Sequence, residues 1–258
     1  MKPLAALDAR GIGALLFDID ETFSTAGKIT AQAYGALERL HAAGTRTVAV
    51  TGRPAGWCDH IARMWPVDAV VGENGAFYFR HAAGQLRRQY HEPPETRAHH
   101  RERLAQVARQ ILAAVPGCAI AADQPYRETD LAIDYCEDVP PLPLSEAERI
   151  AGLMCAAGLH AKVSSIHVNG WFGDYDKLAM TRRLFRDEFG MDLARERNSL
   201  VYVGDSPNDA PMFGFFPRSV GVANVQRFGA LLSTAPQYVT TASSGAGFAE
   251  VVAHLLAA

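Results

Sequence analysis

Residues 14–22 read Ala-Leu-Leu-Phe-Asp-Ile-Asp-Glu-Thr, an apolar run that changes into alternating carboxylates. The four apolar residues predict a buried strand. Beyond its end the side chains of Asp18 and Asp20 share one side, and Ile19 takes the other. Two carboxylates this close repel each other unless a cation binds between them or one pKa is raised. An Asp-rich turn after a strand explains these residues equally well, so other segments must decide.

The size and charge of the chain exclude several classes of protein. With 258 residues, 48% of them hydrophobic, it can build one large domain or a core with a smaller insert, which excludes disorder. The net charge of -3, with both signs interleaved, argues against a nucleic acid or an anionic membrane as the main partner. No apolar run approaches the length of a membrane span, and Asp8 and Arg10 interrupt any signal-like stretch. We therefore expect a cytoplasmic protein that binds a small soluble ligand.

Strands and helices alternate in the first third of the chain. Thr30 fits the N-cap of a helix that reaches residue 43, and residues 47–50 form a β-branched strand followed by Thr51. Residues 69–71 predict a third buried strand, followed by a polar stretch that includes Asn74. This alternation predicts a parallel sheet covered on both faces, whose ligands bind beyond the carboxyl ends of the strands.

The pattern changes between residues 81 and 172. Helical patterns at 95–115 and 145–157 separate several strand-like runs that follow one another, so we expect an α+β insert with an antiparallel sheet. The strand–helix alternation then resumes. The expected division is therefore a core of residues 1–80 and 173–258, and an inserted cap of residues 81–172.

Polar residues follow four separate elements of the expected core. They are Asp18 and Asp20, Thr51, Lys177 at a helix start, and Asp205 with Asn208 and Asp209. Their order resembles the haloacid dehalogenase-like (HAD) phosphohydrolase superfamily, whose motifs are Asp-x-Asp-x-Thr, a Ser or Thr ending a strand, a Lys, and Gly-Asp-x-x-Asn-Asp. The resemblance implies a Rossmann-like core with a parallel sheet.

The cap position and two further motifs resemble one subgroup, HAD subfamily IIB. The motifs are Asn-Gly-Ala at residues 74–76 and Gly-Asp-Ser-Pro-Asn-Asp at 204–209. This subgroup contains Cof-type, sucrose-phosphate and mannosyl-3-phosphoglycerate phosphatases and carries a type C2 cap. The chain departs from it at Glu21, where Gly is common, at Phe23, where Leu is common, and at residues 173–176, which lack a frequent Lys-Gly pair.

The resemblance implies phosphoryl transfer with Mg²⁺ as cofactor. Asp18 would be the nucleophile that forms an aspartyl-phosphate, and Asp20 would be the general acid and base. The metal would be held by the carboxylates of Asp18 and Asp205 and the main-chain oxygen of Asp20. This assignment makes the chain a phosphoric monoester hydrolase, acting as a monomer or a small homo-oligomer.

The phosphate oxygens need donors of their own. Thr51, Gly52, Lys177 and Asn208 are the candidates, and Asp209 would support Lys177 or a metal-bound water. Each has a plain structural alternative, because Thr51 can cap the next helix, Lys177 can be a solvated first-turn residue, and Asn208 with Asp209 can begin a helix.

The cap must select the substrate, since the core recognises only phosphate. Residues 81–172 hold nine Lys and Arg against eleven Asp and Glu, which excludes a broad cationic funnel for a polyanion. The candidates for substrate contact are Asn74, Arg127, Lys162 and His167, with the last three on strand-like runs. The subgroup implies a sugar phosphate or a phosphorylated glycoside.

Three other readings stay open. A hydrolytic dehalogenase on the same scaffold would need neither Asp20 nor Asp205, and the cap placement is less typical of a mutase. A non-catalytic protein that binds a phosphorylated metabolite is the alternative from another class. Arg53 receives no role.

Overall fold

A nine-stranded sheet forms the core, in the order β1-β13-β12-β11-β2-β3-β4-β5-β6. The computed structural model describes residues 1–229 and 231–258. From β1 to β4 in this order, all neighbouring strands pair in parallel. Strand β5 pairs antiparallel with both β4 and β6. The bounds are β1 (Lys2–Pro3), β2 (Ala14–Phe17), β3 (Arg46–Val50), β4 (Ala69–Gly72), β5 (Phe77–Ala82), β6 (Gln85–Tyr90), β11 (Leu200–Gly204), β12 (Ser219–Gly221) and β13 (Tyr238–Val239).

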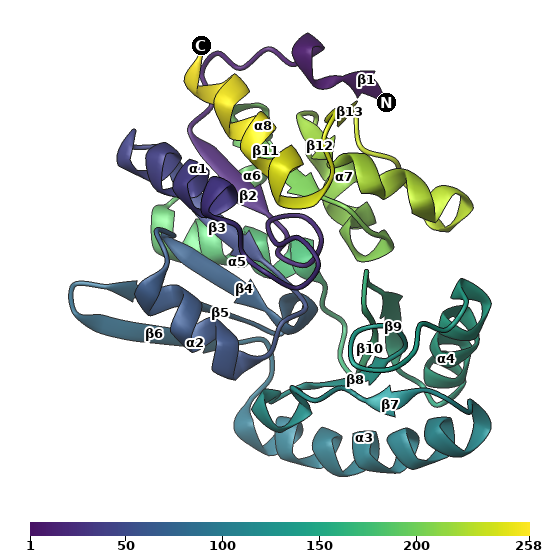
Figure 1. Cartoon of the computed structure of the whole chain (residues 1–258). Helices are drawn as coiled ribbons and strands as arrows, with labels where there is room; N and C mark the ends of the chain where they lie inside the picture. Colours follow the sequence, from purple (N-terminus) through teal and green to yellow (C-terminus); the bar gives the residue numbers. More distant parts are fainter.

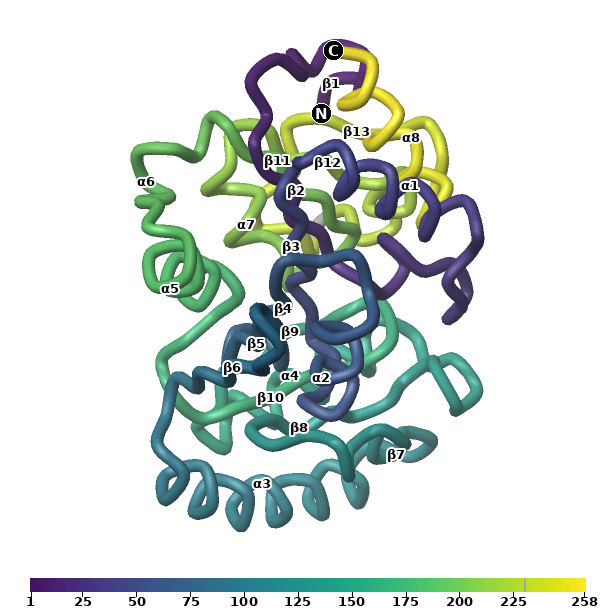
Figure 2. Tube along the Cα trace, turned by 90° about the vertical axis from the view of Figure 1, so that its left-hand side faces the viewer, coloured from purple at the N-terminus to yellow at the C-terminus, as the bar shows by residue number. Residues whose placement is uncertain are grey.

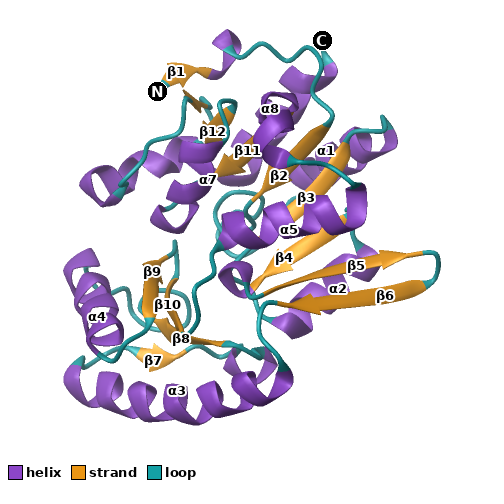
Figure 3. Ribbon diagram, turned by 180° about the vertical axis from the view of Figure 1, so that it is seen from behind, coloured by secondary structure: helices purple, strands orange, loops and turns teal.

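Helices cover both faces of this sheet, as Figure 3 shows. Helices α1 (Ala31–Ala42), α2 (Ala55–Met64) and α8 (Ser244–Leu256) lie on one face, and α5 (Lys177–Phe189), α6 (Leu193–Glu196) and α7 (Ala210–Phe215) lie on the other. Successive residues of β2 alternate between the two apolar layers, with Leu15 and Phe17 in one and Ala14 and Leu16 in the other. The expected α/β core with a parallel sheet is confirmed.

A second, antiparallel sheet lies below the core in Figure 1, with helices α3 and α4 packed against it. Its order is β7-β8-β10-β9. The elements are α3 (Pro94–Ala114), β7 (Ala119–Ile120), β8 (Asp130–Asp134), α4 (Leu144–Ala156), β9 (His160–Val163) and β10 (His167–Trp171). Leu131, Ile133 and Val168 pack with the two helices, so the other face of β8 and β10 carries polar residues: Asp130, Asp134, His167 and Asn169.

The chain crosses to this second sheet later than residue 81. Strands β5 and β6 form a hairpin that extends the core sheet, and the crossings lie at residues 91–93 and 172–176 (Figure 2). The sequence of β6 hides this edge strand, because Leu86 is its one aliphatic residue and most of the others are solvated. No helix in the described residues is long and apolar enough to cross a membrane.

Short 3-10 turns connect the larger elements. They are η1 (Leu4–Ala6), η2 (Glu73–Gly75), η3 (Gln124–Tyr126), η4 (Arg197–Ser199), η5 (Pro207–Asp209) and η6 (Ala223–Leu231).

Candidate active site

The carboxyl ends of three adjacent strands bring the motif residues together. Strand β2 lies between β3 and β11, so Asp18, Thr51 and Asp205 follow neighbouring strands at the same edge of the sheet. The backbone N–H of Asp18 donates to the carbonyl of Val203 at 2.9 Å, which extends the strand pairing up to the site. All three side chains are buried. Side chains far apart in the sequence therefore share one position set by the sheet.

Lys177 joins these strand ends from the first turn of α5. Its Nζ donates to Asp18 Oδ1 and to Asp209 Oδ1, both at 2.8 Å, and the side chain is only 1% exposed. Burial lowers the pKa of this ammonium, but the two carboxylates outweigh it and raise the pKa above its ordinary value. A solvated first-turn lysine is therefore the wrong interpretation, and Lys177 is the buried counter-ion of the acidic cluster.

Thr51 and Asp209 also make local contacts. The hydroxyl of Thr51 accepts from the backbone N–H of Arg53 at 3.1 Å, and Ser206 with Asp209 forms a capping box at η5. The second carboxylate oxygen of Asp209 accepts from the N–H groups of Asp205 and Ser206, at 3.0 and 3.2 Å. Asp209 therefore begins a helical turn, as the structural alternative expected, and its other oxygen also accepts from Lys177.

Three buried carboxylates gather at the site, and two of them, Asp18 and Asp205, are the candidate ligands of a divalent cation. Oxygens of Asp18, Asp205 and Asp209 lie within 4.8 Å of one another. Asp205 Oδ2 accepts from Asn224 at 3.0 Å, whereas its Oδ1 is buried with no hydrogen-bond partner among the described residues. A buried carboxylate oxygen without a donor is costly unless a cation contacts it. An all-oxygen set of this kind suits Mg²⁺ or Ca²⁺.

Two carboxyl groups of the acidic cluster have raised pKa values when no cation is bound. Burial raises the pKa of Asp18 to about 7; Lys177 opposes this shift, and Asp209 and Asp20 add to it. Burial, and then repulsion from Asp18 and Asp209, raise the pKa of Asp205 well above its ordinary value. A cation bound here would return both groups to the ionised form.

The carboxylate of Asp20 pairs with Arg53. Its two carboxylate oxygens accept from Arg53 Nε at 2.9 and 3.0 Å, and Oδ1 also accepts from Nη2 at 2.7 Å. The main-chain oxygen of Asp20 accepts from the hydroxyl of Ser165, in the cap, at 3.4 Å. Arg53, to which the sequence assigned no role, is therefore the direct partner of the expected acid and base.

A small polar pocket lies between the core and the inner face of the cap. Its lining residues are Asp18, Asp20, Gly52, Arg53, Arg127, Ser164, Ile166, His167, Asn169 and Asn208. Two of the expected cap residues, Arg127 and His167, thus reach it. Lys162 lies on the edge strand β9 and lines a different hollow beside the start of α5. Arg127 follows η3 instead of lying on a strand.

Asn74 and Asn208 meet beside Gly52. Asn208 Nδ2 donates to Asn74 Oδ1 at 3.3 Å, while Asn74 Nδ2 is buried and has no partner among the described residues. A Cβ on Gly52 would lie only 3.2 Å from the Asn74 amide. Asn74 and its neighbour Glu73 both have positive φ, and Gly75 comes so close to the Asp176 carbonyl that a side chain there has no room. The turn therefore needs this Gly to place Asn74 next to α5.

Four polar residues of the site were missed from the sequence. Asn169 could have been found, because it alternates with the apolar Val168 on β10 and shares a face with His167. Arg53, Asp123 and Glu137 lie in loops without periodicity, so no pattern indicated their direction.

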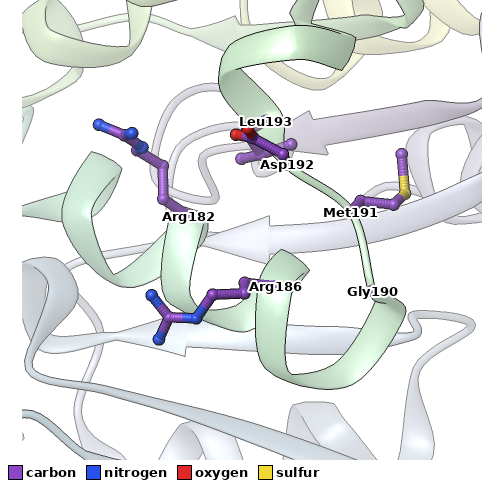
Figure 4. A pocket seen from close by; sticks show the side chains of 6 residues that line it. All are labelled: Arg182, Arg186, Gly190, Met191, Asp192 and Leu193. Atoms are coloured by element: carbon purple, nitrogen blue, oxygen red, sulfur yellow. The ribbon is translucent and has the colours of Figure 1, made fainter.

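A hollow at the far end of α5 is separate from this site. Figure 4 shows two arginines on successive turns of α5 and the chain that leads into α6 closing the other side. Its lining residues are Arg182, Arg186, Gly190, Met191, Asp192 and Leu193, all outside the motifs.

Comparison with known proteins agrees with this geometry. Residues 15–114 match the family model described as haloacid dehalogenase-like hydrolase, and no curated protein matches the chain. A Thermoplasma acidophilum protein of known structure is 16% identical with a TM-score of 0.71, covering 95% of this chain and 98% of its own. The sucrose-phosphatase of Synechocystis, solved with sucrose and phosphate, is 17% identical with a TM-score of 0.63, covering 95% and 98%.

A third solved structure is a HAD subclass IIB sugar phosphatase. It is 16% identical with a TM-score of 0.62, and the match covers 93% of this chain and 98% of that one. At such identities the likeness establishes a shared fold. Residues 15–114 thus match the haloacid dehalogenase-like hydrolase model, and the chain as a whole shares its fold with these solved structures.

Proposed function

We propose that this protein is a Mg²⁺-dependent phosphatase that hydrolyses a small phosphorylated metabolite through an aspartyl-phosphate on Asp18. The observation that carries the proposal is the buried meeting of Asp18, Lys177 and Asp205, in which Asp205 Oδ1 has no partner among the described residues. A nucleophilic carboxylate, a fixed ammonium and a free carboxylate oxygen are what phosphoryl transfer from an ester requires.

The first half of the reaction breaks the ester bond. A carboxylate oxygen of Asp18 attacks phosphorus, the bond to the ester oxygen breaks, and Asp20 gives its proton to the leaving alkoxide. Lys177 stabilises Asp18 and the charge on the equatorial oxygens, to which Thr51, Gly52 and Asn208 are the further donors. Mg²⁺, when bound through Asp18, Asp205 and the main-chain oxygen of Asp20, supplies Lewis-acid charge neutralisation.

The second half releases phosphate. Asp20, now a carboxylate, takes a proton from water, whose oxygen attacks phosphorus and frees Asp18. Asp209 keeps Lys177 in place through its 2.8 Å contact. Each half therefore leaves Asp20 in the protonation state that the other half needs.

We propose a sugar phosphate or a phosphorylated glycoside as the substrate. The small pocket beside Asp18 is lined by hydroxyl, amide, imidazole and guanidinium groups, from Ser164, Asn169, His167, Arg53 and Arg127. Such groups satisfy the hydroxyls of a sugar. Two proteins of the same fold are named as sugar phosphatases, which supports the same class here.

The test is phosphate release from sugar phosphates, nucleotides and p-nitrophenyl phosphate, with Mg²⁺ and with EDTA. We expect metal-dependent release with sugar phosphates among the best substrates, its loss in Asp18→Asn, and parent-like activity in the exposed control Asp8→Asn. Stabilisation by some panel members without any turnover would contradict the proposal and favour a binding protein.

A further inference from the structure

One guanidinium joins the core of the protein to its cap. Arg53 follows β3 in the core and is 5% exposed. Besides Asp20, it binds two cap carboxylates, with Nη1 3.2 Å from Asp123 Oδ2 and Nη2 2.7 Å from Glu137 Oε1. The face of the guanidinium lies 4.4 Å from the ring of Trp57. Three carboxylates and one aromatic ring thus fix its plane.

Both cap carboxylates are themselves held by cap residues. Asp123 accepts from Arg127 at 3.0 and 3.1 Å, and Arg127 also donates to the carbonyl of Gly52 in the core at 2.7 Å. Glu137 Oε2 lies 2.8 Å from His167 Nε2. Burial alone would raise the pKa of Glu137, but His167 and Arg53 lower it to about 2. The network therefore runs without a break from Asp20 to the inner face of the cap.

Arg53 also separates two hollows. The inner pocket holds Asp18, whereas an outer one lies between residues 20–27 of the core and residues 136–137 of the cap. Asp20, Arg53 and Ile166 line both. The ion pair of Arg53 with Glu137 thus lies where the outer hollow meets the inner pocket.

We propose that Arg53 is a positioning residue that couples closure of the cap to proton transfer at Asp20. This inference rests on the proposed phosphatase function. When the cap is closed, Asp123 and Glu137 fix the guanidinium, and its Nε and Nη2 hold the Asp20 carboxyl in one orientation. When the cap opens, Arg53 loses two of its three anions and can rotate. Asp20 is then oriented for proton transfer only while the site is closed to water.

Leaving groups of different basicity separate positioning from simple structural support. A sugar alkoxide needs a proton from Asp20, whereas p-nitrophenolate leaves without one, and general acid catalysis contributes about 10²-fold or more. In Glu137→Gln we expect kcat/KM, which reports the ester-cleaving half, to fall about 10-fold or more for a glucose phosphate and to change less than about 3-fold for p-nitrophenyl phosphate, because part of that acid catalysis is lost. Arg53→Lys keeps the charge but loses the fork, so it should show the same split.

The matched control is Asp138→Asn, which changes the next carboxylate of the same loop. Asp138 is exposed and lies outside the contacts of Arg53. It should leave both kcat/KM values unchanged. Equal losses on both substrates in Glu137→Gln, or no loss on either, would overturn the proposal.

Hydrogen exchange supplies a readout that needs no turnover. The cap N–H groups of Glu128 and Thr129 donate to Glu73 of the core at 2.9 and 2.6 Å, so their exchange reports separation of cap and core. We expect faster exchange at both amides in Glu137→Gln and parent-like exchange in Asp138→Asn. Unchanged exchange in Glu137→Gln overturns the coupling, even if no phosphatase activity is found. If the parent shows no turnover but the variant exchanges faster, the phosphatase function is refuted and the contact of Glu137 between cap and core is supported.

Discussion

The floor and the roof of the site are built in different ways. In the floor, Asp18, Asp205 and Lys177 follow a strand or begin a helix, so the parallel sheet itself fixes their positions. In the roof, Arg127 and Glu137 come from loops; Arg127 donates to the carbonyl of Gly52 in the core, and Glu137 forms an ion pair with Arg53. The nucleophile and its buried partners are therefore placed by backbone geometry, whereas the groups that join the cap to the core are placed by side-chain contacts.

The largest effect should come from the floor. Asp18→Asn replaces the nucleophile with an amide and should lower kcat by about 10⁴-fold or more, since loss of a nucleophile removes the covalent route. Phosphate release in the presence of Mg²⁺ measures this. Because the amide is nearly isosteric and relieves repulsion among carboxylates, the melting temperature should not fall. A decrease in kcat of less than about 10-fold would refute the role of Asp18 as nucleophile.

The second-largest effect should come from removing the buried ammonium of Lys177, which lowers the free energy of unfolding. Lys177→Met leaves Asp18 and Asp209 without their shared partner and should cost about 3–5 kcal/mol in the free energy of unfolding. Denaturant unfolding of the metal-free protein measures it, with the exposed Lys28→Met as control. The double variant Asp18→Asn, Lys177→Met should cost less than the sum of the single variants. Additive costs would contradict a shared ionic contact.

Metal binding should depend on pH in a defined direction. The folded-state pKa of Asp18 is raised from 3.8 to about 7, and that of Asp205 is also raised, so between these values the metal-free folded state binds more protons than the unfolded one. Its stability from these groups is therefore greatest at low pH and is lost as pH rises toward 7. Mg²⁺ should offset the loss by about 2.7 kcal/mol at a hundredfold excess over Kd.

Thermal unfolding with Mg²⁺ and with EDTA at pH 5 and at pH 8 tests this direction. The increase in Tm caused by Mg²⁺ should be larger at the higher pH. An equal or smaller increase in Tm at pH 8 would show that Asp18 and Asp205, the carboxyl groups with raised pKa values, are not the metal ligands.

The smallest effect belongs to the roof. The hydroxyl and the N–H of Thr129 both donate to the buried carboxylate of Glu73. Thr129→Val keeps the shape but removes the hydroxyl donor, so we expect a loss of about 1–3 kcal/mol and faster exchange of the Glu128 amide. The exposed Thr241→Val is the control. Parent-like stability and exchange in Thr129→Val would show that this contact does not hold the cap.

Sequence patterns reached the floor of the site almost completely and the roof only in part. Asp18, Thr51 and Asp205 were predictable because an apolar run ending in polar residues marks the edge of a parallel sheet. Lys177 was predictable from the resemblance, but no residue near it in the sequence indicated that its side chain would be buried. The hairpin β5–β6 was missed because an edge strand needs few apolar residues.

The roof needed three-dimensional contacts. Arg53 pairs with Asp123 and Glu137, which lie 70 and 84 residues away, and no local period encodes such a partner. Lys162 was expected at the site because it lies on a strand-like run of the cap, yet its place on the edge strand takes it to another hollow.

Acid quenching during turnover tests the central claim most directly. The protein is mixed with its best substrate and Mg²⁺, quenched in acid, digested, and mapped by mass spectrometry. We expect one phosphoryl group on the peptide that contains Asp18, and its absence in Asp18→Asn. Two results would contradict the aspartyl-phosphate on Asp18. In both the parent releases phosphate, but the phosphoryl group is found on another peptide, or on no peptide at any quench time.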